Sequence, residues 1–185
     1  MTNLCSCRRS LLGWAAVSAA SAIAPLGLLA GCSEQAAQQR ALVPVEMDRS
    51  TSCELDGMLL ADYPGPKAQV HFVGQDKPSF FCDTVELFHT LLAGEQVRAV
   101  QAVYVQDMGK ADWNQPQGHW IDAKAAFYVL GSKRHGSMGP TIASFAQEVD
   151  AAKFAAEFGG KVLRFGDIKA DMVDLSGGAL HDTRM

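Results

Sequence analysis

The sequence lacks the short motifs that mark common enzyme classes. It contains no His-Glu-x-x-His zinc-protease motif and no Gly-x-Ser-x-Gly nucleophile elbow. The glycines at 57, 65 and 74 are isolated, and no glycine-rich loop ends in Lys-Ser or Lys-Thr, so a phosphate-binding loop is excluded. A structural zinc site typically contains a C-x₂-C pair, and here Asp56 stands three residues after Cys53. These absences favour a protein that is not an enzyme and does not hold zinc.

The sequence also lacks an excess of basic residues. Its 16 lysines and arginines, which include Arg8 and Arg9 near the N-terminus, are outnumbered by 20 aspartates and glutamates. Nucleic-acid binding needs a basic stripe or patch, because the phosphate backbone supplies most of the affinity. We therefore expect no nucleic-acid partner.

The N-terminus reads as a secretion signal. Residues 1–31 carry two arginines followed by an apolar run, and Leu29-Ala30-Gly31-Cys32 resembles a bacterial lipoprotein cleavage box. The apolar run of about 20 residues could alternatively span a bilayer, but Pro25 and Gly27 interrupt it. We expect cleavage before Cys32, lipidation of Cys32, and a polar tether over residues 32–48. The domain would then be anchored on the periplasmic side of a bacterial membrane.

Only two cysteines remain for the folded domain. Cys5 and Cys7 lie in the expected signal and Cys32 is the expected lipidation site, so Cys53 and Cys82 are left. Exported proteins commonly form disulfides, and the spacing alone favours a Cys53–Cys82 disulfide. The alternative is that both thiols stay reduced and bind a metal.

Several sulfur and imidazole side chains fall at loops or at the ends of expected strands. For a single methionine the ordinary role is to fill a gap in the core. Soft sulfur ligands, few in number, select Cu(I) over zinc, so together these residues predict a Cu(I) site. The candidates are Cys53, Met58, Cys82, Met108, His119 and Met138.

The hydrophobic pattern repeats the same order of elements twice, which predicts an α+β fold of two similar ββαβ units. Asp83 or Thr84 is expected to begin the first helix and Asp150 the second. Each unit is too small to sustain a core easily, so the two should share an interface. The predicted boundaries are 49–107 for the first unit, 108–124 for a connecting segment, 125–175 for the second unit and 176–185 for a tail. Expected strands are 69–73, 78–81, 99–105, 126–130, 141–145 and 161–165, with a short final helix over 168–175.

Several motifs together resemble the NosL family of copper-binding lipoproteins. They are the lipoprotein box, Cys53-x-x-Asp56-Gly-Met58, Tyr63-Pro-Gly-Pro-Lys67, Phe81-Cys82-Asp-Thr84, Tyr104-Val-Gln-Asp-Met108, Trp120-Ile-Asp-Ala123 and Met138-Gly-Pro-Thr-Ile-Ala-Ser-Phe145. The resemblance runs to about residue 168. It implies a fold like that of the organomercurial lyase MerB domain and a single bound Cu(I). It also implies delivery of copper to the apo-protein of nitrous oxide reductase, and docking to an ABC-type membrane complex.

One position departs from the family pattern. Members often read Cys-x-x-Cys-Gly-Met, whereas this chain has Asp56 in place of the second cysteine. The resemblance therefore implies a copper site centred on Met58, Cys82 and Met108, with His119 as a nitrogen donor, Cys53 as a less favoured ligand, and Asp56 or Asp107 as a hard or neighbouring contact. The alternatives are a thiol-dependent organometal lyase and a metal-free structural lipoprotein that contains the disulfide.

Overall fold

The structure is a computed structural model that describes residues 42–94, 97–173 and 175. The expected signal peptide, Cys32, the first part of the tether and the tail at 176–185 lie outside the described residues. Among the described residues, no helix has both the length and the apolar character needed to cross a membrane.

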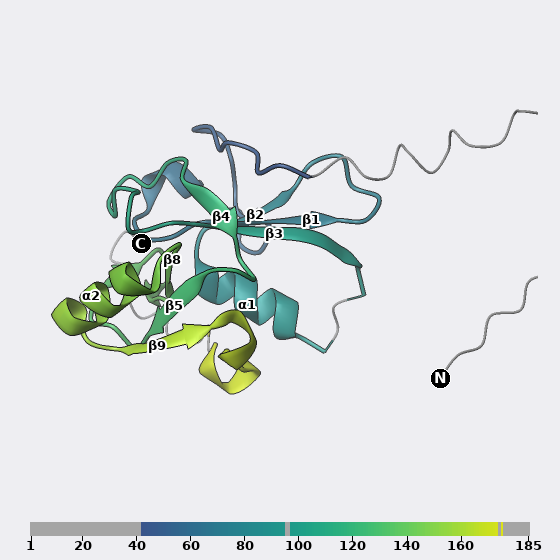
Figure 1. Ribbon diagram of the computed structural model, residues 1–185. Helices are drawn as coiled ribbons and strands as arrows, with labels where there is room; N and C mark the ends of the chain where they lie inside the picture. Colours follow the sequence, from purple (N-terminus) through teal and green to yellow (C-terminus); the bar gives the residue numbers. More distant parts are fainter. Residues whose placement is uncertain (1–41, 95–96, 174, 176–185) are drawn as a thin grey trace, which may run out of the picture. The chain divides into compact units, whose positions relative to one another are not determined.

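The first ββαβ unit forms a four-stranded antiparallel sheet with the order β2-β1-β3-β4 and a single helix (Figure 1). Asp83 begins helix α1, because its carboxylate accepts a hydrogen bond from the backbone N–H of Val85. The fourth strand, β4, comes from the segment that the sequence analysis treats as an irregular connection. The elements are β1 (Ala68–Phe72), β2 (Ser79–Phe81), α1 (Thr84–Leu92), β3 (Val100–Gln106) and β4 (Trp120–Asp122).

The second unit repeats the topology of the first. Its three-stranded antiparallel sheet has the order β8-β5-β9, which matches β2-β1-β3, and α2 again precedes the last strand. The predicted α+β fold of two ββαβ units is thus confirmed. A small hairpin of β6 and β7 is inserted between the first two strands of this sheet. The elements are β5 (Phe127–Leu130), β6 (His135–Gly136), β7 (Gly139–Pro140), β8 (Ala143–Phe145), α2 (Glu148–Phe158) and β9 (Lys161–Arg164).

Two local expectations need correction. Helix α2 begins at Glu148 after Gln147, so Asp150 lies inside its first turn instead of preceding it. An acidic residue is favourable in either position because the helix dipole is positive there. In place of the predicted helix over 168–175, the described residues form one 3₁₀ turn, η4 (Ala170–Met172). Another 3₁₀ turn, η3 (Phe165–Asp167), precedes it, and η2 (Leu60–Asp62) lies in the first unit.

The two units share one hydrophobic core, as their small size requires. Helix α1 contributes Phe88, whose ring lies 5.1 Å from that of Tyr128 on β5 and 5.2 Å from that of Phe165 in η3. Alternation along β1 directs Ala68, Val70 and Phe72 into this core. Its remaining side chains therefore face the other side of the sheet.

That other side is covered by residues 42–48, which we call the N-terminal strap. Gln69 on β1 accepts a hydrogen bond from Val45 N (2.8 Å) and donates one to Val45 O (2.9 Å). The hydroxyl of Tyr104 on β3 donates to the carbonyl of Leu42. The sequence assigns these residues to a polar tether, but the structure shows them held on the sheet (Figure 1), since buried amide groups such as that of Gln69 need partners.

Candidate metal centre

The Cys53–Met58 segment forms a tight loop that lies against β2. Cys53 N–H donates to Met58 O (2.8 Å), and Gly57 N–H donates to Cys53 O (3.0 Å). Gly57 has a φ of 77°, a conformation that glycine adopts without the strain that a side chain would bring. Glu54 N–H donates to Phe80 O (2.7 Å), which places Cys53 beside the end of β2.

Cys82 lies between β2 and the start of α1, and its backbone is held by two donors. The ammonium group of Lys67 donates to Cys82 O (3.0 Å) and to Pro64 O (2.9 Å), and the Ser137 hydroxyl also donates to Cys82 O. Lys67 is fully buried, and this burial lowers its pKa to about 8. The position of Cys82 is therefore fixed by residues from both units.

Cys53 and Cys82 meet in the structure together with two carboxyl groups. One ligand atom from each of Cys53, Asp56, Cys82 and Glu86 lies within 4.8 Å of the others. Cys53 Sγ and Cys82 Sγ lie 3.2 and 3.0 Å from the same oxygen, Glu86 Oε2. Both cysteines are buried and both are free thiols, so the disulfide that spacing favours is not formed.

The replacement of the second motif cysteine by Asp56 does not leave Cys53 without a neighbouring thiol. The motif lacks a second thiol in sequence, but Cys82 supplies one in space, because its Sγ lies 4.0 Å from the Asp56 carboxylate. Asp56 is exposed, and its other oxygen accepts a hydrogen bond from Met58 N (2.9 Å). The two-thiol site is thus completed by a residue from a different element.

Burial and mutual hydrogen bonding set the protonation of this cluster. Burial, followed by the charge of Cys53, raises the pKa of Glu86 to about 9, so its carboxyl group keeps its proton at neutral pH. A hydrogen bond from the Cys82 thiol lowers the pKa of Cys53 to about 6. The same hydrogen bond, together with burial, raises the pKa of Cys82. The pair therefore loses its first proton easily and retains its second.

Thioether groups surround the two thiols. Cys53, Cys82 and Leu60 form a small buried cluster, and half-buried side chains pack against it. Three of these are methionines from three separate segments: Met47 in the strap, Met58 in the loop and Met138 between β6 and β7. Sulfur from both units is therefore gathered around one buried pair of thiols.

The β6–β7 hairpin brings Met138 to this place through close backbone contact. A Cβ atom on Gly136 would lie 2.2 Å from Asp83 Oδ2, and one on Gly65 would lie 2.6 Å from the Gly136 Cα. Thr141 donates a hydrogen bond to Asp83 Oδ1 (2.7 Å). Glycine at 65 and 136 therefore allows the hairpin of the second unit to approach the cysteine end of the first.

The structure does not bring Met108 and His119 to the thiols. Met108 packs against a separate core cluster of the second unit that includes Trp113 and Phe154. His119 is exposed and has a φ of 54°. Asp107 is buried, and its Oδ1 accepts hydrogen bonds from Gly109 N (3.1 Å) and Ala146 N (3.0 Å).

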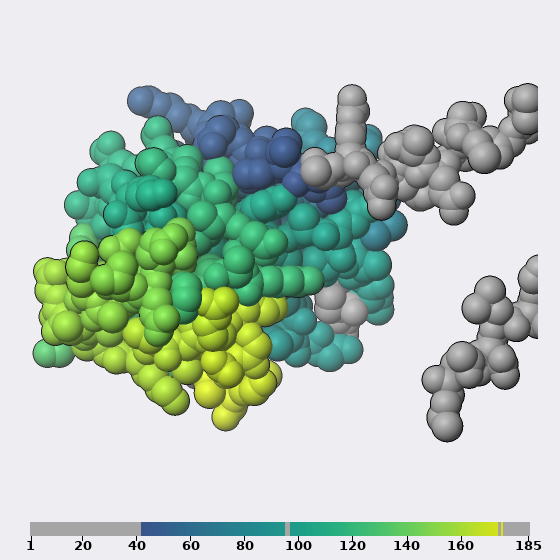
Figure 2. All heavy atoms as spheres, viewed as in Figure 1, coloured from purple at the N-terminus to yellow at the C-terminus, as the bar shows by residue number. Residues whose placement is uncertain are grey.

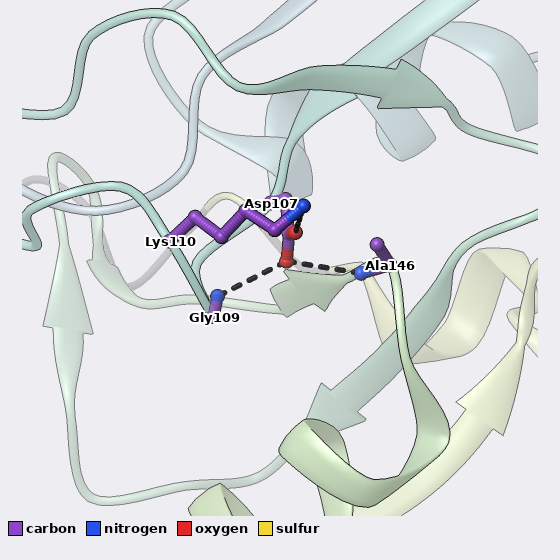
Figure 3. A network of polar contacts seen from close by, with 4 residues as sticks. All are labelled: Asp107, Gly109, Lys110 and Ala146. Atoms are coloured by element: carbon purple, nitrogen blue, oxygen red, sulfur yellow. Dashed lines mark hydrogen bonds and ion pairs between the residues drawn. The ribbon is translucent and has the colours of Figure 1, made fainter.

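Figure 3 shows that the Asp107 carboxylate joins the end of β3 to the segment that follows β8. Lys110 lies 3.9 Å from its second oxygen. These contacts explain the burial of Asp107 without a metal, since a buried carboxylate needs hydrogen-bond partners.

Replacing Asp107 by alanine is expected to lower the free energy of unfolding by about 2 kcal/mol, because two backbone N–H groups lose a charged acceptor. Chemical denaturation measures this change. The matched control is Asp112→Ala, since Asp112 also accepts from two backbone N–H groups, of Asn114 and Gln115, but is exposed. Equal losses in both variants would contradict a special role for the buried carboxylate at the junction.

Sequence reasoning missed Glu86, Lys67 and Met47. Glu86 follows Cys82 by four residues, a spacing that places both on one face at the start of a helix. The signal was available, because Glu86 is an acidic residue flanked by apolar ones in the first turn of α1. For Met47 the sequence offers no signal, since only the folding of the strap onto the sheet brings it near the thiols.

The chain is similar to known proteins of one family. The family model NosL matches residues 44–173. The copper-binding lipoprotein NosL of Stutzerimonas stutzeri is 39% identical over 159 residues, covering 83% of each chain. That of Achromobacter cycloclastes is 40% identical over 154 residues, covering 81% of this chain and 79% of the relative.

A solved structure shares the fold. The crystal structure of the copper chaperone NosL from Shewanella denitrificans is 39% identical in sequence, with a TM-score of 0.67. The match covers 70% of this chain and 97% of that one. A family model that spans most of the chain, together with these relatives, shows that the protein belongs to the NosL family.

Proposed function

We propose that this protein is a copper chaperone that binds one Cu(I) between the thiols of Cys53 and Cys82. The observation that carries this proposal is the pair of free, buried thiols surrounded by half-buried thioethers. Soft sulfur ligands suit Cu(I), and a site of few ligands suits its low coordination number. The names of the relatives, which describe copper-binding lipoproteins and a copper chaperone, support the same function.

The protonation of the cluster favours sulfur over oxygen as the metal ligand. Metal ligands must lose their protons to bind, so a carboxyl group that keeps its proton is a weak ligand. Glu86 has a pKa raised by burial to about 9, whereas the pKa of Cys53 is lowered to about 6 by the Cys82 hydrogen bond. At neutral pH the Cys53 thiol is therefore the group ready to bind, and Cys82 gives up its proton when the metal binds.

The proposed ligands are Cys53 and Cys82, completed by Met58 or Met138. Relative to the set implied by the family motifs, this set raises Cys53 to a principal ligand and replaces Met108 and His119 with Met138. The reason is packing, because Met138 contacts the thiol cluster and Met108 packs elsewhere.

The family and the N-terminal sequence support a cellular role. We propose that the chain is lipidated at Cys32, sits on the periplasmic side of a bacterial membrane, and passes copper to the apo-protein of nitrous oxide reductase with the help of an ABC-type membrane complex. Ligand exchange with an acceptor requires no catalysis, so the protein acts as a carrier and not as an enzyme.

Anaerobic titration with Cu(I), competed by a chromophoric chelator, tests the proposal. The reduced protein is expected to bind one equivalent. The same titration after oxidation of the two thiols to a disulfide is expected to show weak binding or none, because a disulfide sulfur is not a thiolate. Failure of the reduced protein to compete would contradict the copper site and favour a metal-free structural lipoprotein.

A second function is favoured by one observation. An organometal lyase of the thiol type needs two cysteines and an acid, and here two thiols lie within 4.8 Å of two carboxyl groups. In such a reaction the thiolates bind the metal of an organometal while an acid proton replaces it on carbon. Incubation with a phenylmercury salt and detection of benzene decides between the two functions, since a chaperone binds the mercury without releasing benzene.

A further inference from the structure

Met47 lies between the thiol cluster and the surface. Its side chain packs against the cluster of Cys53, Leu60 and Cys82, and it also lines a cavity of about 190 Å³. The other walls of this cavity are largely polar and include Arg49, Asp62, Gln115 and Gln117. Met47 is thus a thioether that packs against the cluster containing the buried thiols and also lines a cavity open to the outside.

The backbone on the N-terminal side of Met47 is fixed on the sheet. Gln69, which is fully buried, uses both ends of its amide to bind the backbone of Val45 at 2.8 and 2.9 Å. Trp120 Nε1–H donates to the carboxylate of Glu46 at 3.3 Å. Figure 2 shows dark blue atoms, the colour of the strap, exposed on the molecular surface.

The backbone on the C-terminal side of Met47 is fixed as well. Asp48 Oδ1 accepts hydrogen bonds from Ser50 N (2.8 Å), Ser50 Oγ (2.7 Å) and Thr51 Oγ1 (3.1 Å). Thr51 N–H donates to Asp48 O (3.2 Å). Met47 thus stands between a segment bound to the sheet and a hydrogen-bonded turn, and it packs against the cluster of Cys53, Leu60 and Cys82.

We propose that Met47 is the exchange ligand of the copper site: its thioether takes Cu(I) from the buried thiols and presents it in the cavity to a sulfur donor of the acceptor. This inference rests on the proposed copper-binding function. The principal ligands are deeply buried, with Cys82 fully inaccessible and Cys53 4% exposed, so an acceptor cannot reach them directly. A half-buried thioether between them and an open cavity provides the intermediate contact that associative exchange requires.

The exchange changes no oxidation state. Copper remains Cu(I) throughout. A bond to Met47 forms as one copper–thiolate bond of the buried site breaks, a bond to an acceptor sulfur forms as the second copper–thiolate bond breaks, and a second acceptor sulfur then displaces Met47. The two thiolates left behind take up the protons that the acceptor thiols lose. A neutral thioether is a suitable intermediate ligand because it binds a soft ion without holding it as firmly as a thiolate.

The test measures both the Cu(I) dissociation constant and the rate at which Cu(I) leaves the protein. The Cu(I)-loaded protein is mixed anaerobically with dithiothreitol, a small soft acceptor, and the copper left on the protein is measured over time after rapid separation. Met47→Leu keeps the apolar volume and removes the sulfur. We expect release to slow by about tenfold, which reports a higher barrier for transfer, while the Cu(I) dissociation constant changes by less than about threefold.

Two variants act as controls. Met172→Leu removes a methionine that is 38% exposed in η4 and should change neither quantity. Met58→Leu removes a proposed resident ligand and should weaken equilibrium binding. A Met47→Leu protein that releases copper at the rate of the unmodified protein overturns the proposal. One that loses equilibrium affinity as strongly as Met58→Leu overturns it too, because Met47 would then be a resident ligand.

A measurement on the unmodified protein covers the case in which Met47→Leu does not fold. With ¹³C-labelled methionine methyl groups, the Met47 signal should shift or broaden when copper is present at half an equivalent. A sharp, unshifted Met47 signal overturns the proposal. Absence of any bound Cu(I) in the equilibrium titration is a different result, since it removes the copper site itself and is seen before transfer is measured.

Discussion

Replacing Cys82 by serine is expected to weaken Cu(I) binding by at least about a hundredfold, equivalent to roughly 2.7 kcal/mol. Serine replaces the thiol by a hydroxyl of similar shape at a position that Lys67 and Ser137 hold through the backbone carbonyl. A hydroxyl is a hard donor that stays protonated at neutral pH, whereas a thiolate is the soft ligand that Cu(I) prefers. Anaerobic competition with a chromophoric chelator measures the change.

Cys53→Ser should produce a loss of the same order. The family motif alone gives Cys53 a smaller role, because its usual second cysteine is Asp56 here. The structure places the two thiols side by side, since both approach the same Glu86 oxygen at 3.2 and 3.0 Å. Unchanged binding in Cys53→Ser would show that Cys82 acts with thioethers alone.

Met108→Leu is the matched control for these variants. Met108 packs with Trp113 and Phe154, away from the thiol cluster, so copper affinity should not change. A loss of affinity in this variant equal to that of Cys82→Ser would mean that the ligand set implied by the sequence motifs is correct and that the packing-based set is not.

Replacing Glu86 by glutamine is expected to stabilise the reduced, metal-free protein at neutral pH. Glu86 is fully buried in the first turn of α1, and its Oε1 has no hydrogen-bond partner among the residues that the structure describes. Glutamine keeps the shape and a neutral polar group, but it has no proton to lose. The expected gain is about 3 kcal/mol at pH 7, an upper limit because the pKa shift is shared with the neighbouring thiols.

The effect of Glu86 on the free energy of unfolding depends on pH through proton linkage. Burial raises the pKa of Glu86 from 4.5 in the unfolded chain to about 9 in the folded protein, so the folded state holds more protons between these two values. The contribution of the protonated Glu86 carboxyl to stability is fully present below pH 4.5 and is lost as the pH rises toward 9. Stability of the unmodified protein should thus fall with pH by up to about 1.4 kcal/mol per unit relative to Glu86→Gln.

Chemical denaturation between pH 5 and 8.5, under reducing conditions, measures this difference. Glu157→Gln provides the control, because Glu157 is an exposed glutamate on α2 and should give no gain. If the free energies of unfolding of Glu86→Gln and of the unmodified protein change with pH in parallel, burial does not hold the carboxyl group neutral. The argument from protonation for sulfur ligands would then be wrong.

The sequence by itself determined the repeated fold. Periodicity in the strands and helices is a local property, so the order ββαβ could be found twice, and the start of the first helix could be placed at Asp83 or Thr84. Strand β4 could not be predicted in this way. A short edge strand is defined by its pairing with a neighbour, here Trp120 with Gln106, and not by its own hydrophobic pattern. The repeat itself required no long-range information.

The choice of residues for the proposed copper site depends on the tertiary structure. The sequence identified Cys53, Met58, Cys82 and Met138 as soft ligands, but it could not separate them from Met108 and His119, because all of them lie near loops. Only the approach of the β6–β7 hairpin to the end of β2, which Gly65 and Gly136 allow, selects Met138. The geometry of a metal site depends on contacts between residues distant in sequence, and no local pattern encodes these contacts. For the same reason, Glu86 and Met47 could be identified only from the folded positions of the strap, the Cys53–Met58 loop and α1.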